Sequence, residues 1–366
     1  MYIHQLKDWP FFIWNTESIH FRLGEVRHRQ GRILGLMSSA GFKLQESAVL
    51  NTLTLDVTKS SEIEGEKLNT DQVRSSIARR LGIEIAGAMH ADRNVDGVVE
   101  MMLDATQKYT DDLTADRLFD WHAALFPTGR SGMHKIKVAA WRTPQAGPMQ
   151  VVSGAMGKEK VHFEAPEAGR LPVEMDSFLN WFNAKSTTDA VLKAAIAHLW
   201  FVTIHPFDDG NGRITRAITD MQLARADKTP QRFYSMSAQI LKERAAYYAM
   251  LEQTQKGSLD ITPWLSWFLD CLFHAMDFTE ETLSTVATRT QFWEKNRGIL
   301  LNSRQQYMVS ALLDEFHGKL TSTKWAKMTK SSPDTALRDI QDLIEKGILE
   351  KEPGGGRNTT YALITI

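Results

Sequence analysis

Cysteine is almost absent from this chain of 366 residues, which contains only Cys271. A single cysteine excludes a disulfide within the chain, and with it the class of small secreted domains that disulfides hold together. Cys271 lies in an apolar run, so we expect it to be buried by packing rather than to be reactive. The histidines are scattered and form no spacing typical of a zinc site. This usage fits a protein of the reducing cytoplasm.

Two further absences concern membranes and nucleic acids. No apolar run approaches the ~18 residues that a membrane-spanning helix needs, and residues 1–15 lack the charged and apolar regions of a signal peptide. Lysine and arginine number 43 against 44 aspartates and glutamates, which gives a net charge of −1. Such a balance creates no overall field toward nucleic acid or an acidic membrane. We therefore expect a cytoplasmic protein with no membrane partner.

What the chain does contain is one dense motif, residues 205–216, which read HPFDDGNGRITR. Before it, residues 189–204 repeat apolar side chains at helical spacing, and Pro206 favours a helix end near His205. The residues that follow the motif repeat the same spacing. The pattern predicts a tight loop at 209–212 that opens onto the N-terminus of a helix.

Such a loop suits phosphate groups. Gly210 and Gly212 let the backbone approach a ligand closely and adopt positive φ. The unpaired N–H groups and the dipole of the helix start favour an anion. A carboxylate at Asp209 conflicts with an anion unless a cation lies between them, and Mg²⁺ held by one carboxylate and by ligand phosphates resolves the conflict.

Three further side chains in the motif complete the chemistry. Arg213 and Arg216 are one helical turn apart and can fork onto phosphate oxygens. Histidine titrates near neutrality, so His205 can take a proton from an incoming hydroxyl. The pattern therefore indicates transfer of a phosphate-linked group onto a hydroxyl.

The motif resembles the signature of the Fic family, His-Pro-Phe-x-(Asp/Glu)-Gly-Asn-Gly-Arg-x-x-Arg, at every defined position. Fic proteins mostly transfer AMP from ATP to a Ser, Thr or Tyr hydroxyl of a target protein. The resemblance therefore implies ATP as co-substrate, Mg²⁺ as cofactor and a target protein as partner. It also implies these roles: His205 as base, Asp209 as Mg²⁺ ligand, Gly210, Asn211 and Gly212 as the anion hole, Arg213 on the phosphates, and Arg216 as the clamp on the terminal phosphate.

Upstream, residues 60–66 read SSEIEGE, which by pattern alone is an acidic helix end stopped by Gly65. Beside a Fic signature, Ser60-x-x-x-Glu64-Gly65 resembles the family's inhibitory motif, (Ser/Thr)-x-x-x-Glu-(Gly/Asn). The resemblance implies that Glu64 pairs with Arg216 and blocks the place of the γ-phosphate. A carboxylate can replace a phosphate on an arginine fork. Its position upstream of the core implies a branch in which inhibition is carried within the same chain.

Residues 128–170 lose the helical period and gain glycine and proline. Within them, 138–142 and 149–152 are predicted to be the two short strands of a hairpin. Fic proteins have a β-flap at this place, which registers the target backbone as an added strand; an ordinary surface loop is the alternative. The resemblance implies that four flap residues border the nucleotide: Val151, Val152, Ser153 and Gly154.

Farther along, Arg244-Ala245-Ala246-Tyr247-Tyr248 matches the family's Arg-x-x-Tyr-Tyr. The resemblance implies that Tyr247 and Tyr248 line the adenine pocket, where an aromatic face favours a purine. Core packing is the alternative for both tyrosines. Some relatives have Asn at the position of Gln255, so a hydrogen bond from Gln255 to adenine stays open. We take His198, two helical turns before the motif, as structural.

Residues 304–366 show three helical stretches and a Gly-tipped hairpin, which look like a winged helix-turn-helix. DNA binding is the obvious interpretation of that shape, but an element that faces phosphates should be basic. The predicted recognition helix holds two basic residues against four acidic ones: Asp334, Asp339, Asp342 and Glu345. The charges leave DNA binding open and favour docking to a protein or packing.

We predict a mainly α protein with a helical Fic core and β-hairpin flap, an N-terminal helical regulatory region and a C-terminal winged helix-turn-helix. The opening YIHQLKDWPFFIWN looks like the N-terminal module of one branch of bacterial Fic proteins. The predicted domains are 1–112, the core at 113–275, a linker helix at 276–303, and 304–366. The leading function is AMP transfer onto target proteins, autoinhibited by Glu64. The alternatives are a deAMPylating Fic enzyme, and a nucleotide-binding transcriptional regulator or scaffold that acts through the winged-helix domain. The target and the oligomeric state, a homodimer included, stay open.

Overall fold

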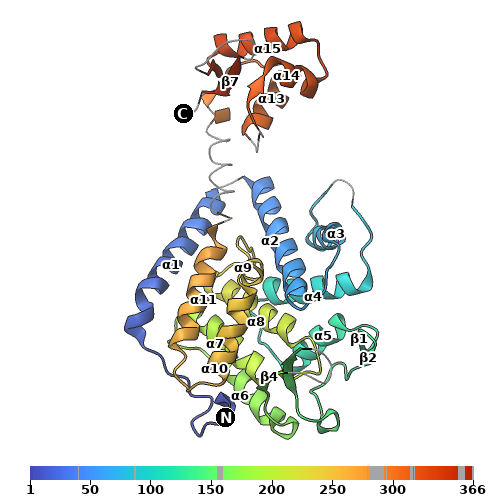
Figure 1. Cartoon of the computed structure of the whole chain (residues 1–366), viewed down its shortest axis with the longest axis vertical. Helices are drawn as coiled ribbons and strands as arrows, with labels where there is room; N and C mark the ends of the chain where they lie inside the picture. The colour runs from blue at the N-terminus through green and yellow to red at the C-terminus, as the bar shows by residue number, and fades with distance from the viewer. Residues whose placement is uncertain are drawn as a thin grey trace. The chain divides into compact units, whose positions relative to one another are not determined.

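The computed structural model describes residues 1–39, 41–85, 88–154, 160–277, 279, 292–293, 295–313, 316, 318–352 and 359–364. Contacts within the chain divide it into two compact units, Met1–Thr279 and Glu280–Ile366. Most described residues lie in helices, as the sequence predicts (Figure 1). The predicted border after residue 112 falls inside the first unit, so the division into a regulatory region and a core stays a prediction.

The first unit is an assembly of helices with two small pairs of strands. Its α-helices are α1 (Thr16–Ser39), α2 (Phe42–Ile63), α3 (Thr70–Leu81), α4 (Arg93–Gln107), α5 (Ala115–Leu125), α6 (Leu171–Asn183), α7 (Ala190–Ile204), α8 (Asn211–Asp227), α9 (Met236–Lys242), α10 (Arg244–Gln255) and α11 (Thr262–Ala275). Three short 3₁₀ turns cover Ile3–Gln5, Pro144–Ala146 and Ala168–Arg170. Across the described residues, no helix combines the length and the apolar character that crossing a membrane would need.

Helices α7 and α8 form the centre of this unit (Figure 1). Every residue of α7 from Val191 to Ile204 is buried, which is expected of a helix that is apolar on all sides. Near the end of α8, Gln222 Nε2 donates to Ala190 O at the start of α7 (3.3 Å). The two helices are therefore antiparallel, and the motif loop joins them at one end.

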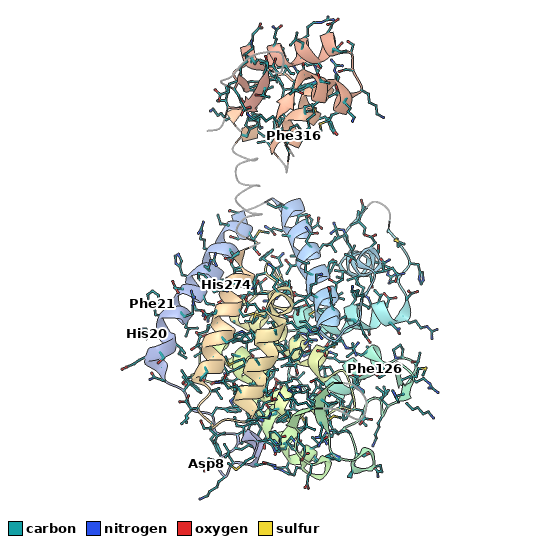
Figure 2. All side chains as sticks on the ribbon, viewed as in Figure 1. Asp8, His20, Phe21, Phe126, His274 and Phe316 are labelled. Atoms are coloured by element: carbon teal, nitrogen blue, oxygen red, sulfur yellow. The ribbon has the colours of Figure 1, made fainter. Side chains whose placement is uncertain are left out.

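The remaining helices enclose this pair. Helix α1 packs along α11, and His20 and Phe21 project from its outer side (Figure 2). Ahead of α1, the rings of Trp9 and Phe12 lie edge-on against Trp200 of α7 (6.2 and 5.9 Å between ring centroids). The N-terminal segment is thus part of the core that supports α7. Cys271 of α11 is buried, as predicted.

Helix α2 packs against α3, α8 and α9. Glu64 directly follows its last residue, and Gly65 turns the chain away with a left-handed φ of 88°. This arrangement leaves the Glu64 side chain at the end of a helix that also contacts α8.

The predicted flap is present, but only one of its two strands, the one predicted at 149–152, is the one expected. Strand β3 (Gln150–Ser153) pairs antiparallel with β4 (Lys160–Glu164), with a bulge between Val151 and Val152. The predicted partner strand at 138–142 is wrong, because its polar backbone groups have other partners: the N–H of residue 142 donates to Pro206 O (2.9 Å), and that of residue 139 to an imidazole. A second small pair joins β1 (Arg130–Ser131) to β2 (His134–Lys135).

Among the described residues of the second unit there are three helices and a three-stranded antiparallel sheet of order β5-β7-β6. Its elements are α13 (Ser303–Leu313), β5 (Leu320–Thr321), α14 (Ser322–Thr329), α15 (Pro333–Glu345), β6 (Leu349–Lys351) and β7 (Thr360–Leu363). They enclose a core around Trp325, Ile340 and Leu343. The elements agree with the predicted pattern, while the winged-helix assignment stays a prediction. Much of the predicted linker helix, and the glycine-rich tip at 353–356, lie outside the described residues.

The acidic residues of α15 do not all face solvent. Asp339 is 6% exposed and accepts from Arg304 at the start of α13 (2.7 and 3.0 Å). Asp342 accepts from Gln305 of α13 (2.7 Å) and from Lys346 (2.5 Å). Two of the four carboxylates used to argue against DNA therefore hold α15 to α13, which weakens that charge argument.

Candidate functional site

His205 lies at the C-terminal end of α7, where the backbone is in the left-handed region (φ 53°, ψ 58°). Its Nδ1 lies 3.1 Å from Val202 O. Because a carbonyl oxygen only accepts, Nδ1 carries the proton and Nε2 the lone pair. Burial lowers the pKa of His205, and the Arg142 guanidinium lowers it further, whereas the carboxylates of Glu64 and Asp209 raise it. A neutral imidazole with its lone pair on Nε2 is the state that a general base needs.

The loop after His205 is closed by its own asparagine. Asn211 Oδ1 accepts from Phe207 N (2.9 Å), and Asn211 Nδ2 donates to Phe207 O (2.8 Å). Gly210 has φ 80°, and a Cβ there would lie 2.8 Å from the ring of Phe126. The turn therefore needs glycine, and it delivers the chain into α8 at Asn211. The first turn of α8 is where a helix presents backbone N–H groups that have no partner within it.

Asp209 is oriented from several sides. Its Oδ2 accepts from the hydroxyl of Ser131 in β1, and its Oδ1 from Gly210 N (2.5 Å). Its backbone oxygen accepts from His122 Nε2 (3.1 Å), and the His122 ring stacks on Phe207 (4.3 Å). The carboxylate thus has a defined direction before any ligand is bound.

Both motif arginines are buried and face the end of α2. Arg216 Nε donates to Ser60 Oγ, and Nη2 donates to Ser60 O and to Glu64 Oε1, each at 2.8 Å. A Cβ on Gly212 would lie 2.0 Å from Glu64 Oε1. The glycine therefore makes room for the carboxylate over the first turn of α8. The structure brings together the two distant stretches that the family resemblance had paired.

A second ion pair lies next to the first. Arg213 Nη1 donates to Glu66 Oε2 at 2.6 Å, and the Arg213 guanidinium also lies 5.1 Å from the ring of Phe126. The Arg213 side chain is 4% exposed, whereas that of Glu66 is 52% exposed. Sequence reasoning missed Glu66, although it follows Glu64 by only two residues.

A cavity of about 740 Å³ joins the motif loop to the flap and α10. Of the predicted site residues, its wall includes Glu64, Val151, Val152, Ser153, His205, Asp209, Asn211, Gly212, Tyr247 and Tyr248. Gly154, Gly210, Arg213, Arg216, Ser60 and Gly65 lie outside this wall. The predicted base, the predicted metal ligand and the helix N-terminus therefore share one chamber.

Comparison with known proteins bears on this chamber. Residues 112–223 match the family model described as "Fic/DOC family", and residues 2–83 match the "Domain of unknown function (DUF4172)". Residues 112–223 therefore form a Fic domain. The domain match covers α5 to most of α8, and so includes the whole motif loop.

Curated relatives that the chain matches are named "Protein adenylyltransferase Fic". That of Drosophila virilis is 31% identical over 150 residues, which cover 40% of this chain and 28% of the relative. That of Aedes aegypti is 27% identical over 226 residues, 59% of this chain and 39% of the relative. The chain thus spans well under half the length of these relatives.

Solved structures show the same fold. A Fic family protein from Desulfovibrio desulfuricans G20 has a TM-score of 0.55 and 20% identity, and the match covers 96% of this chain and 97% of that one. A Fic domain containing signaling protein from Bacteroides thetaiotaomicron has a TM-score of 0.52 and 19% identity, over 72% of this chain and 97% of that one.

The two tyrosines of α10 have different surroundings. Tyr247 is 2% exposed, and its hydroxyl lies 2.9 Å from Nε2 of the buried His198. Burial, and secondarily Arg216, lowers the pKa of His198 to about 3, which fits the structural role predicted for it. Tyr248 is 38% exposed, and its hydroxyl donates to Ile63 O (3.4 Å). Tyr248 therefore offers the more accessible ring, while much of Tyr247 is core.

Gln255 of α10 also lines the cavity, and its Nε2 donates to Thr203 Oγ1 (3.2 Å). One of the two amide protons of Gln255 is therefore used in a hydrogen bond to α7. The question of a bond from Gln255 to adenine stays open.

A hydrogen-bonded chain that the sequence analysis missed ties the flap to α10. Ser153 Oγ lies 2.5 Å from His162 Nε2, and His162 Nδ1 lies 2.6 Å from Glu252 Oε2. Lys256 and His162 hydrogen-bond to Glu252 and lower its pKa to about 2, so the carboxylate is ionised at neutral pH. These residues share no sequence motif, because strand pairing in the flap is what brings them together.

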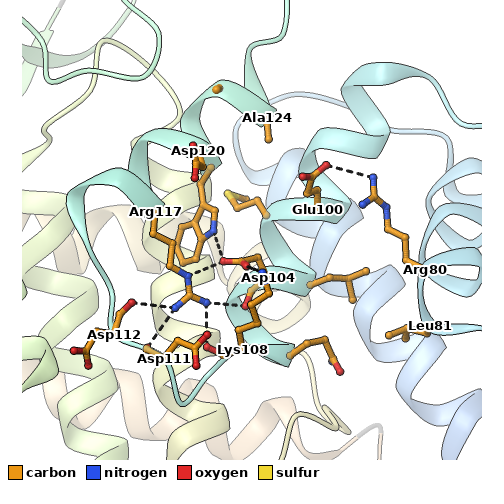
Figure 3. A pocket seen from close by; sticks show the side chains of 15 residues that line it. Arg80, Leu81, Glu100, Asp104, Lys108, Asp111, Asp112, Arg117, Asp120 and Ala124 are labelled. Atoms are coloured by element: carbon orange, nitrogen blue, oxygen red, sulfur yellow. Dashed lines mark hydrogen bonds and ion pairs between the residues drawn. The ribbon is translucent and has the colours of Figure 1, made fainter.

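Another cavity, of about 960 Å³, lies between α3, α4 and α5 (Figure 3). Its charged groups largely pair with one another: Arg117 Nε and Trp121 Nε1 donate to Asp104 (2.6 and 2.8 Å), and Arg80 pairs with Glu100 (3.4 Å). It contains no residue of the Fic motif, so the smaller chamber is the candidate site.

Proposed function

We propose that this protein is a nucleotidyltransferase that moves AMP from ATP onto a Ser, Thr or Tyr hydroxyl of a target protein. The observation that carries the proposal is the shared chamber, in which His205 and Asp209 meet the N-terminus of α8. The printed name of the curated relatives, protein adenylyltransferase, supports the same reaction. Some family chemistry runs in reverse, but we propose transfer as the main activity.

In this proposal His205 acts as general base. Its Nε2 takes the proton of the target hydroxyl while the oxygen forms a bond to the α-phosphorus. The bond from that phosphorus to the oxygen bridging the β-phosphorus breaks, and pyrophosphate leaves. The N–H groups of the first turn of α8, with Arg213 and Arg216, hold the phosphate oxygens and the charge that develops on them.

The donor set at Asp209 suits Mg²⁺, which binds through one or two carboxylates and the phosphates of its substrate. Asp209 and the neighbouring Asp208 both line the chamber, and two hydrogen bonds orient the Asp209 carboxylate. Among the described residues no group of three acidic, histidine or cysteine side chains forms a cage, so phosphates and water would complete the coordination. When bound, the ion would neutralise phosphate charge.

We further propose that Glu64 inhibits the transfer. Its carboxylate occupies Arg216 Nη2 (2.8 Å) and lies over Gly212, where a terminal phosphate would otherwise find a guanidinium. A nucleotide that binds beside this pair would have its α-phosphate displaced from the line of attack.

The test is label transfer from α-labelled ATP with Mg²⁺, followed by mass spectrometry of the chain and of native lysate proteins. We expect covalent AMP on a hydroxyl when the Glu64→Gly variant is used, and none when His205→Ala is used. Nucleotide binding without any adduct, even with Glu64→Gly, would contradict the enzyme and favour the nucleotide-binding regulator.

A further inference from the structure

Arg142 belongs to none of the motifs discussed so far, yet its side chain reaches the end of α7. It is 4% exposed. Its Nε donates to His205 O at 2.8 Å, and its Nη2 reaches Ile204 O at 3.4 Å and Pro166 O. Its backbone N–H donates to Pro206 O at 2.9 Å. A single residue therefore holds three consecutive carbonyl groups, 204 to 206, and ties them to the segment after the flap.

These carbonyls belong to a turn with an unfavourable backbone conformation. His205 is one of few non-glycine residues with positive φ among the described residues, a conformation that costs roughly 1–2 kcal/mol for an L-residue. Such a residue persists only when its surroundings impose the conformation. The C-terminal end of a helix also favours a cation, and the planar guanidinium can serve several carbonyls at once, which an ammonium cannot do as well.

We propose that Arg142 is a positioning residue for His205: it holds the left-handed turn that aims the imidazole into the chamber and keeps a positive charge beside it. The name of the reaction that His205 serves rests on the proposed function. The contacts of Arg142 do not depend on it.

The charge has a consequence that a purely structural role would lack. Arg142 is the cation that faces His205, while the carboxylates of Glu64 from α2 and Asp209 from the loop face it with the opposite sign. The other charged or titratable side chains in the chamber wall include Asp208, Arg244, His162 and Glu252. Burial lowers the pKa of Arg142, yet a guanidinium stays charged near neutrality. Burial still lowers the pKa of His205 when that cation is removed, but the lowering by Arg142 is lost, so the pKa rises relative to the parent protein.

Loss of this charge should shift the pH dependence of activity in a defined direction. The base must be neutral, and a raised pKa keeps it protonated up to a higher pH. The acid limb of the pH profile of kcat/KM therefore moves to higher pH when the charge at position 142 is lost.

The experiment compares Arg142→Gln and Arg142→Lys in the Glu64→Gly background. Both variants should lower kcat, by about 10²-fold if the imidazole is displaced by about 1 Å, with little change in KM for ATP. Only Arg142→Gln should move the acid limb, because lysine keeps the charge. Arg79→Gln serves as the matched control, since the Arg79 side chain is 53% exposed and pairs with Asp96 on the surface.

A readout without turnover separates this inference from the proposed function. NMR of ¹³C-labelled histidines, with His205 assigned from a His205→Gln variant, gives the pKa of His205 in each protein. A higher pKa in Arg142→Gln than in the Glu64→Gly parent, with the parent's pKa kept in Arg142→Lys, supports the inference even if no variant transfers AMP. The kcat of the Glu64→Gly parent and an unchanged His205 pKa in both variants would overturn it. If Arg142→Gln fails to fold, Arg142→Lys alone tests the inference. A lowered kcat with an unshifted acid limb supports it, and the kcat of the Glu64→Gly parent overturns it.

Discussion

The two sides of the chamber are built in different ways. On one side, the motif loop is held by short-range contacts, such as Asn211 closing on Phe207 four residues earlier, and by residues that are buried. On the other side, the flap is a two-stranded hairpin whose Val152 and Val161 are 48% and 38% exposed. It reaches α10 through the chain Ser153–His162–Glu252. The comparison suggests that chemistry resides in the buried side and that recognition of nucleotide and target resides in the exposed one.

The largest loss of AMP transfer is expected from removal of the proposed general base on the buried side. His205→Ala deletes an imidazole that lines the chamber, and loss of a general base costs roughly 10²–10⁴ in rate. ATP binding and the melting temperature should stay close to wild type, because the side chain makes one hydrogen bond within the described part of the chain, to Val202 O. Single-turnover kinetics with α-labelled ATP measures the loss. Transfer at the wild-type rate would remove His205 from the mechanism.

The second prediction concerns the contact that covers the buried side. Glu64→Gly frees Arg216 Nη2 for phosphate and should raise AMP transfer by up to about 10²-fold, the rate cost of a misplacement of about 1 Å. Arg216→Ala in the same background should be inactive, because the clamp is then missing. The same label-transfer assay checks both. If Glu64→Gly shows no gain in AMP transfer and a small loss of stability, Glu64 only ends a helix and does not inhibit.

The third prediction tests the contact between Glu64 and Gly212 by measuring stability alone. In Gly212→Ala the new Cβ would lie 2.0 Å from Glu64 Oε1, and overpacking of this kind costs about 1–3 kcal/mol. In the Glu64→Gly background this clash is gone, and the nearest remaining neighbour is Arg216 Nη1 at 3.3 Å, the end of a flexible side chain. Once that side chain gives way slightly, the helix preference of alanine over glycine, up to about 1 kcal/mol in its favour, should remain. The effect of Gly212→Ala on the free energy of unfolding should thus change sign between backgrounds in urea titrations. Equal effects in both would contradict the contact.

The smallest effect is expected on the exposed side. His162→Gln removes the link between flap and α10, and since His162 and Glu252 are about a quarter exposed, the pair should contribute only ~0.2–1 kcal/mol. We expect KM for ATP to rise by at most about fivefold at unchanged kcat. Lys160→Ala, on the same strand but outside the chamber wall, is the matched control. A fall in kcat instead of a rise in KM would place His162 with the catalytic side.

Several features follow from the sequence because they depend on neighbours in the chain. Periodicity predicts α7 and α8, and Pro206 with two glycines predicts the loop between them. The family signature then assigns roles to the loop residues, and its inhibitory motif pairs Glu64 with Arg216, a contact that the structure contains. These patterns are readable because a helix period, a turn and a short motif each require particular residue types at fixed spacing.

Other features were decided only by the tertiary structure. The partner of β3 is β4 rather than 138–142, because the backbone of that segment donates to the motif loop instead. Glu66 and Arg142 contact motif residues, and the His162–Glu252 pair lines the chamber, from elements far apart in sequence. Lone charged residues carry no spacing signal, and their partners are set by which helix ends and strand edges the packing brings within hydrogen-bond distance. The local chain thus determines the catalytic loop, and long-range packing determines what holds, covers and borders it.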